Sequence, residues 1–323
     1  MVNKTLKDAR FSTDSNCTDI ERNDEIDLKE VLNAIWSGKY IVLIITFLSA
    51  IIAITISLNL PNIYRSEVLL SPASSEQNSG IPSIAGQFGG LAAMAGINLN
   101  SSGNIDKVTL SIEVLRSRNF LSKFIYRHDI LIPLMAGNGW DEVTNRVLLD
   151  PSIYDEKNES WIREATINRT SEPTAQEAIE KMLEIMSVSV DKNTGMVRVS
   201  IDFLSPTLAK NWVDWIISDI NDEMRMRDLS EADKSIKYLK EQLRHTVVAD
   251  MKSVLYQLIE EQSKTKMFAE IRDEYIFKTI DMAVIPEKKL KPKRAIICVF
   301  GTFIGFILGV CLVVFRHFYN GSK

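Results

Sequence analysis

Two long apolar runs dominate the pattern of hydrophobic and polar positions, one near each end of the chain. Residues 40–60 and 295–315 each hold 21 residues without a charge. At 1.5 Å per residue, each run makes a helix of about 32 Å, which is enough to cross the hydrocarbon core of a bilayer. A helix buried in the core of a soluble protein would carry a polar stripe, and neither run has one. The pattern therefore predicts transmembrane helices at 40–60 and 295–315.

Two spans divide the rest of the chain into a tail at 1–39, one domain at 61–294 and a second tail at 316–323. Both tails then lie on one side of the membrane and the domain lies on the other. The first run does not resemble a cleaved signal peptide, because it begins about forty residues into the chain and lacks an A-x-A site. Basic residues are dense just before the second run, but the positive-inside rule is weak for a domain of this length. Charge alone therefore leaves the sidedness open.

The first tail ends in an amphipathic pattern. Residues 1–25 are polar and typical of a disordered segment. After them, apolar residues recur at the spacing of one helical face, at Leu28, Val31, Leu32, Ile35 and Trp36. Asp27 and Glu30 form a capping box at the start of this pattern. It predicts a short helix on the inner membrane surface, with packing against a partner protein as the alternative.

Strand patterns occur at three places in the domain at 61–294. Ile63–Leu70 and Tyr275–Val284 are rich in β-branched and aromatic residues and predict single strands. Between them, apolar and polar residues alternate on both sides of Lys192–Gly195, which predicts a β-hairpin with one buried face.

Helical spacing occurs at 105–126 and at 175–186. Residues 71–104 are rich in Ser, Gly, Ala and Asn and predict a loop, either a flexible linker or an apolar flap that orders on assembly. Residues 127–172 show no clear pattern.

The longest helical pattern begins at Ser205–Pro206, with serine at the cap and proline at the first helical position. From Thr207 to Ile259 there is neither proline nor glycine, so the sequence predicts one helix over about 206–260, roughly 80 Å long. Its first half has an apolar stripe and its second half is polar. This indicates a stalk that projects from a globular α/β base, with a break near Leu229 as the alternative.

Composition gives little support to catalysis. The net charge of −4 argues against general nucleic-acid binding. None of the three cysteines, Cys17, Cys298 and Cys311, lies in the domain at 61–294, which therefore needs no disulfide framework. The sequence has no HExxH, GxSxG or paired CxxC motif, so we expect no metal or cofactor.

Two groups of side chains on the long helix have a structural interpretation. The carboxylates Asp219, Asp222 and Glu223 are interpreted as a solvated helix face. The Trp212–Trp215 pair is interpreted as part of the core rather than as a sugar-stacking platform.

Small residues occur at every fourth position in both predicted spans. The second span has them at Gly301, Gly305 and Gly309, and the first has them at Ser49, Ala53 and Ser57. Faces of this kind let two helices approach closely. They predict packing of the two spans, either with each other or between protomers.

Several motifs follow one another along the chain and together carry a family resemblance. They are Ile26-Asp27-Leu28 through Trp36-x-x-Lys39, Tyr64-x-Ser66, the Gly/Ala loop Gly89–Gly96, Ser205-Pro206-Thr207-Leu208-Ala209 with Trp212, and a proline-containing segment before a glycine-rich second span. In this order they are specific. The chain resembles the chain-length determinant (Wzz-type) polysaccharide co-polymerases of Gram-negative inner membranes over nearly its whole length.

The juxtamembrane segment before the second span departs from the family in part. Its prolines and basic residues are Pro286, Pro292, Lys288, Lys289, Lys291, Lys293 and Arg294. The family usually has another proline between the first two, and Ser-Pro-Lys where this chain has Lys291-Pro292-Lys293. In this chain the basic side chains would anchor the segment among lipid head groups, or bind phosphates of a lipid-linked saccharide.

The resemblance implies a periplasmic α/β base domain at 61–294 with a long protruding helix, and cytoplasmic tails at 1–39 and 316–323. It implies a non-enzymatic ring of roughly eight copies. Such a ring acts with a separate membrane polymerase on a lipid-linked glycan, and sets the chain length of O-antigen or a similar polysaccharide. Larger members append a tyrosine kinase, and we expect none here. The alternative is an export or capsule co-polymerase that works with a separate tyrosine kinase.

Overall fold

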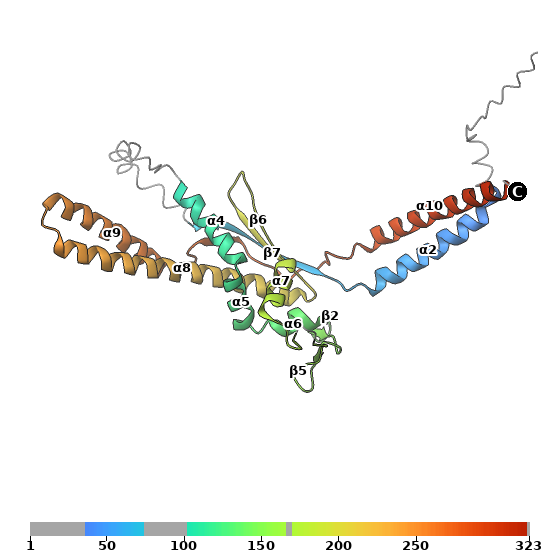
Figure 1. Cartoon of the computed structure of the whole chain (residues 1–323), viewed down its shortest axis with the longest axis horizontal. Coiled ribbons are helices and arrows are strands. Elements are labelled where there is room, and N and C mark those ends of the chain that lie inside the picture. The colour runs from blue at the N-terminus through green and yellow to red at the C-terminus, as the bar shows by residue number, and fades with distance from the viewer. Residues whose placement is uncertain (1–35, 74–101, 166–169, 322–323) are drawn as a thin grey trace, which may run out of the picture. The chain divides into compact units, whose positions relative to one another are not determined.

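The computed structural model describes residues 36–73, 102–165 and 170–321, in two compact units (Figure 1). Leu58–Arg294 form one unit, and Met1–Ser57 with Ala295–Lys323 form the other. The predictions for residues 1–35 and for the Gly/Ala loop Gly89–Gly96 lie outside the described residues. The fold class is confirmed, because a mixed α/β unit is flanked in sequence by two helices long and apolar enough to cross a membrane.

The α/β unit is built on a four-stranded antiparallel sheet with the strand order β6-β7-β1-β8. Its strands are β1 (Tyr64–Pro72), β6 (Met186–Val190), β7 (Val197–Phe203) and β8 (Phe277–Asp281). β6 and β7 form the predicted hairpin, which turns at Gly195 with a φ of 69°. A side chain at that φ would be strained, which explains the glycine.

Helices pack on this sheet and on one another to form the core. They are α4 (Ser102–Arg116), α5 (Arg118–Arg127), α6 (Leu131–Ala136), α7 (Ala175–Ile185) and α8 (Pro206–His245). Phe124 of α5, Met182 of α7 and Trp212 of α8 are almost fully buried with the sheet residues Leu70 and Ile201. The prediction that Trp212 is a core residue is therefore confirmed.

The predicted helix at 105–126 is interrupted once. Ser117 separates α4 from α5, and its hydroxyl oxygen accepts a hydrogen bond from the backbone N–H of Phe120 at 3.3 Å. This is an N-cap, which starts a new helix.

Two small hairpins follow α6, in a segment that has no clear pattern of apolar and polar residues. They are β2 (Gly137–Asp141) with β3 (Arg146–Leu149), and β4 (Tyr154–Asp155) with β5 (Ser160–Trp161). Aspartates shape both turns: a carboxylate oxygen of Asp141 accepts from the backbone N–H of Val143 at 3.1 Å, and one of Asp155 accepts from Lys157 at 2.9 Å. Such turns depend on local bonds rather than on periodicity.

The prediction of one continuous helix over about 206–260 is wrong. α8 starts as predicted, with the Ser205 hydroxyl accepting from the backbone N–H of Leu208 at 3.3 Å, but it ends at His245. α9 (Ala249–Ile271) begins after three residues, Thr246–Val248. Thr246 and Val248 have extended backbone angles, and all three residues are β-branched, which lowers the preference for helix. Neither glycine nor proline was needed for this break, and it does not lie near Leu229.

α9 packs against α8, so the two helices form a hairpin (Figure 1). Ala232 of α8 and Ala269 of α9 are buried, where small side chains allow the helices to approach closely. Lys266 of α9 reaches back to Asp233 of α8 with an Nζ to Oδ1 distance of 2.7 Å. The predicted stalk is therefore a two-helix hairpin rather than a single rod.

A hydrogen-bonded group fixes the end of this hairpin nearest to the sheet. Tyr275 donates its hydroxyl to Asp228 of α8 at 2.6 Å, and Lys107 of α4 lies 2.9 Å from the same carboxylate oxygen. Burial and this bond both raise the pKa of Tyr275, so the phenol remains protonated and continues to donate.

We expect Tyr275→Phe to lower the free energy of unfolding by about 1 kcal/mol, because the half-buried carboxylate of Asp228 loses the phenol donor and keeps only Lys107. Urea denaturation of the purified protein, followed by tryptophan fluorescence, measures the change. Tyr238→Phe is the matched control, since Tyr238 is 64% exposed and makes no hydrogen bond within the described part of the chain. Equal stability of the two variants would contradict the prediction.

Candidate functional site

The two candidate spans pack against each other within their own unit. They are α2 (Lys39–Asn59) and α10 (Arg294–Gly321), and their apolar side chains are mostly exposed on the remaining faces. Large exposed apolar surface on a pair of helices is what a lipid environment requires.

The glycine face of α10 lies on α2. A Cβ added at Gly301 would lie under 3.0 Å from Cβ of Ala53, and one added at Gly305 would lie under 3.0 Å from Cβ and Oγ of Ser49. The Ser49 hydroxyl also donates a hydrogen bond to the carbonyl oxygen of Gly301 at 2.7 Å. The structure therefore brings four of the six predicted packing residues together within one chain.

The other two residues, Gly309 and Ser57, do not meet. The helices run antiparallel, so a step toward the end of α10 is a step toward the start of α2. Gly309 consequently faces Val42, whose Cα would lie 3.1 Å from an added Cβ. Ser57 is buried, but its hydroxyl has no hydrogen-bond partner among the described residues.

The sequence interpretation also missed Gly38, where an added Cβ would lie under 3.0 Å from the side chain of Val313. The sequence did contain a signal for this contact. Gly38 and Val42 are four residues apart, and they continue the helix face of Ser49 and Ala53 toward the N-terminus. Val42 was overlooked because it is not a small residue.

The juxtamembrane segment pairs with the start of the α/β unit. The backbone N–H of Ile63 donates to the carbonyl oxygen of Lys291 at 2.9 Å, and Leu290 donates to the carbonyl oxygen of Ile63 at 2.8 Å. Pro286 and Pro292, on either side of Lys288, Lys289 and Lys291, are half-buried. The chain therefore enters and leaves this unit along two adjacent segments, which are joined by an isolated antiparallel β-bridge between Ile63 and Lys291.

The basic side chains of this segment fall into three groups. Lys291 lies 3.6 Å from a carboxylate oxygen of Asp202, which already forms a two-bond ion pair with Arg65 at 2.6 and 2.9 Å. Lys289 and Arg294 instead share the side-chain oxygen of Asn62, each at 3.3 Å. The third group, Lys288 and Lys293, is exposed.

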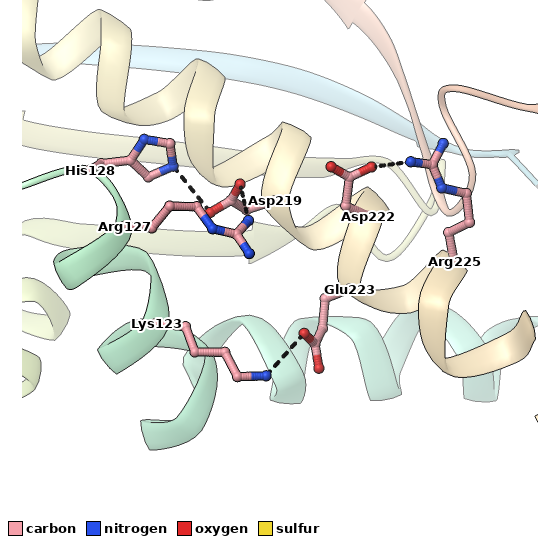
Figure 2. A network of polar contacts seen from close by, with 7 residues as sticks. All are labelled: Lys123, Arg127, His128, Asp219, Asp222, Glu223 and Arg225. Carbon is pink, nitrogen blue, oxygen red and sulfur yellow. Dashed lines mark hydrogen bonds and ion pairs between the residues drawn. The ribbon is translucent and has the colours of Figure 1, made fainter. Parts of the chain in front are cut away.

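A separate polar network joins α5 to α8 (Figure 2). Asp219 is only 9% exposed, and its two oxygens lie 3.0 Å from Arg127 and 3.1 Å from His128. The His128 ring stacks on Trp215 with a centroid distance of 4.7 Å. The interpretation of Asp219 as a solvated carboxylate is therefore wrong, because α5 covers it and supplies its partners.

The neighbouring carboxylates of α8 are also paired. Glu223 lies 3.4 Å from Lys123, and Asp222 lies 2.5 Å from Arg225 (Figure 2). Burial raises the pKa of Glu223, but hydrogen bonds and charges from Arg227 and Lys123 outweigh it, and the net effect is a lowered pKa. A carboxylate that acts as a general acid needs a raised pKa instead, so Glu223 does not fit that role. Within the described ranges no group of three or more His, Cys, Asp or Glu residues could hold a metal ion.

Comparison with known families finds two matches along the chain. The family described as "Chain length determinant protein" (Wzz) matches residues 24–128, which include α2, β1, α4 and α5. Over these residues the chain is similar to the chain length determinant family. A second family, "G-rich domain on putative tyrosine kinase", matches residues 247–318, from the turn after α8 through most of α10. The predicted resemblance is thus confirmed.

Two solved structures are also similar to this chain. A "full-length bacterial polysaccharide co-polymerase" is 14% identical, with 92% of this chain and 99% of that chain covered and a TM-score of 0.39. A fragment of WzzB, a polysaccharide co-polymerase from Salmonella Typhimurium, is 11% identical, with 71% of this chain and 100% of the fragment covered and a TM-score of 0.30. No curated protein matches the sequence.

Proposed function

We propose that this protein is a non-enzymatic scaffold of the bacterial inner membrane, which regulates the chain length of O-antigen or a similar surface polysaccharide. The family match over residues 24–128 is the observation that carries the proposal. The scaffold acts with a separate membrane polymerase, which forms the glycosidic bonds on a lipid-linked glycan.

The proposed topology has both tails in the cytoplasm and the α/β unit in the periplasm. The absence of cysteine between Tyr40 and Ala295 suits an oxidising compartment. With this topology, α2 and α10 hold the unit next to the membrane, where a membrane-bound polymerase and its substrate are found.

The proposed active form is a ring of roughly eight copies. The hairpin of α8 and α9 supports self-association because it leaves large apolar side chains exposed, with Met226 at 63%, Tyr238 at 64% and Tyr256 at 59%. Exposed apolar residues gathered on one element commonly mark a protein interface. A ring of identical copies offers repeated surfaces to one growing polymer, which allows length control without catalysis.

The test is a gel of surface polysaccharide from cells with the gene, without it, and with it restored on a plasmid. We expect the deletion to replace a preferred band with short chains of random length, and the plasmid to restore the band. An unchanged length distribution in the deletion strain would refute the proposal.

A second function is favoured by the match of residues 247–318 to a domain described on a putative tyrosine kinase. In that case the protein is an export or capsule co-polymerase that works with a separate tyrosine kinase. Deletion would then remove surface polymer altogether, and a tyrosine kinase would be recovered with the tagged, full-length protein from solubilised membranes.

A further inference from the structure

Asn62 holds two cationic side chains on one neutral oxygen. Its Oδ1 atom lies 3.3 Å from Nζ of Lys289 and 3.3 Å from Nη2 of Arg294, two residues that follow it by more than 220 positions. An amide oxygen accepts both hydrogen bonds but neutralises neither charge. Two positive charges are therefore brought close together without a counter-charge from Asn62.

The surrounding carboxylates do not supply that counter-charge. Asp202 lies beside Lys291, and both of its carboxylate oxygens already accept hydrogen bonds from Arg65. Glu287 is exposed and forms no ion pair within the described part of the chain. Lys289 and Arg294 likewise have no carboxylate partner there, so their mutual repulsion persists until an anion binds.

Arg294 has unused hydrogen-bonding capacity in addition to its charge. Its Nε atom is buried and has no hydrogen-bond partner among the described residues. A guanidinium presents its N–H groups as a planar fork that fits two oxygens of one tetrahedral anion. A buried N–H on such a fork is costly without an acceptor, and a bound oxyanion would provide one.

Covalent connection places these residues at the ends of both candidate spans. Asn62 comes three positions after Asn59, the last residue of α2, and Arg294 is the first residue of α10. Side chains at such positions reach the level of lipid head groups. The exposed side chains of Lys288 and Lys293 add positive charge to the same short segment.

We propose that Lys289 and Arg294, held in place by Asn62, form a binding site for a phosphate group of a membrane lipid. The phosphate accepts hydrogen bonds from Nζ of Lys289 and from the free edge of the Arg294 guanidinium, and its negative charge removes the repulsion between them. Two lipids present this chemistry: an anionic phospholipid and a polyprenyl diphosphate. The site goes beyond the proposed function, because a lipid phosphate can bind it whether or not the protein controls polymer length.

The test uses full-length protein, purified in detergent and stripped of lipid, with lipid binding measured by native mass spectrometry. Phosphatidylglycerol and a polyprenyl diphosphate are the two probes, and phosphatidylcholine is the neutral comparison. We expect at least one anionic probe to bind about tenfold more tightly than phosphatidylcholine, as charge-assisted bonds to phosphate require. The anionic probe that binds more tightly identifies the class of lipid that supplies the phosphate.

Two variants separate an anion site from a purely structural contact. Lys289→Gln combined with Arg294→Gln should reduce binding of the anionic probe about tenfold, because the charges are lost. Asn62→Asp keeps both cations but gives them an internal counter-charge, so it should also reduce lipid binding while the fold stays at least as stable. A structural role alone would leave lipid binding unchanged in Asn62→Asp.

The matched control replaces two other lysines, Lys240→Gln with Lys252→Gln. Both are exposed on the α8–α9 hairpin and form no ion pair within the described part of the chain, so this variant loses the same charge elsewhere. We expect it to bind the anionic probe as the unaltered protein does. The proposal is overturned if the control loses as much binding as the Lys289/Arg294 variant, or if Asn62→Asp binds the probe normally.

Discussion

Gly305→Leu is expected to abolish the preferred polysaccharide length while the protein still inserts into the membrane. The reason lies in the contact between the spans, where a Cβ at residue 305 would lie under 3.0 Å from both Cβ and Oγ of Ser49. A leucine forces α10 away from α2 and breaks the 2.7 Å hydrogen bond from Ser49 to Gly301. The rest of α10 stays apolar, so insertion is preserved. A polysaccharide gel and a membrane-fraction blot measure the two outcomes.

Two further variants control this experiment. Cys311→Leu adds bulk to an exposed position of the same helix and should leave polymer length unchanged. Ser49→Gly combined with Gly305→Ala removes the side chain that the new Cβ would meet, so it should retain length control better than Gly305→Ala alone. Normal polymer length in Gly305→Leu would show that the contact between the spans does not matter for function.

Local sequence signals were sufficient for much of this fold. The uncharged runs located α2 and α10, and the Ser205–Pro206 cap located the start of α8. Each of these features depends on residues close to one another in the chain. The end of α8 was missed because the break at Thr246–Val248 contains no glycine or proline. Three β-branched residues in succession, of which Val247 is 90% exposed, were the available signal.

Features that depend on distant residues could not be predicted in the same way. Asp219 looks like a surface carboxylate within α8, and only the packing of α5 against it shows that Arg127 and His128 complete its bonds. The pairing of Asn62 with Lys289 and Arg294 joins the two ends of one unit, and nothing in either segment alone indicates it. For the spans, small-residue spacing indicated which faces meet, but the antiparallel register decided that Gly309 contacts Val42.

Asn221→Leu is expected to destabilise the α/β unit more than any other single replacement considered. Asn221 is 5% exposed, and its side chain makes three hydrogen bonds to the backbone at the start of β8. Its Oδ1 accepts from the N–H groups of Ile276 and Phe277, each at 2.9 Å, and its Nδ2 donates to the carbonyl oxygen of Phe277 at 3.1 Å. These bonds fix the edge strand β8 to α8, so the chain returns to the second span along a defined path.

Leucine fills similar space but leaves these backbone groups without their side-chain partner. Each unsatisfied buried group costs about 1 to 3 kcal/mol, so we expect a loss of at least about 3 kcal/mol, a large part of a typical domain's stability. The midpoint of urea denaturation of the full-length protein measures this loss of stability.

Asn211→Leu is the matched control, because it makes the same change on the same helix. Asn211 is half-buried, and its side chain forms no hydrogen bond in the described part of the chain. Because that side chain has no partner to lose, its replacement should change stability by less than about 0.5 kcal/mol. Similar midpoints for the two variants would mean that the Asn221 bonds do not hold β8 in place.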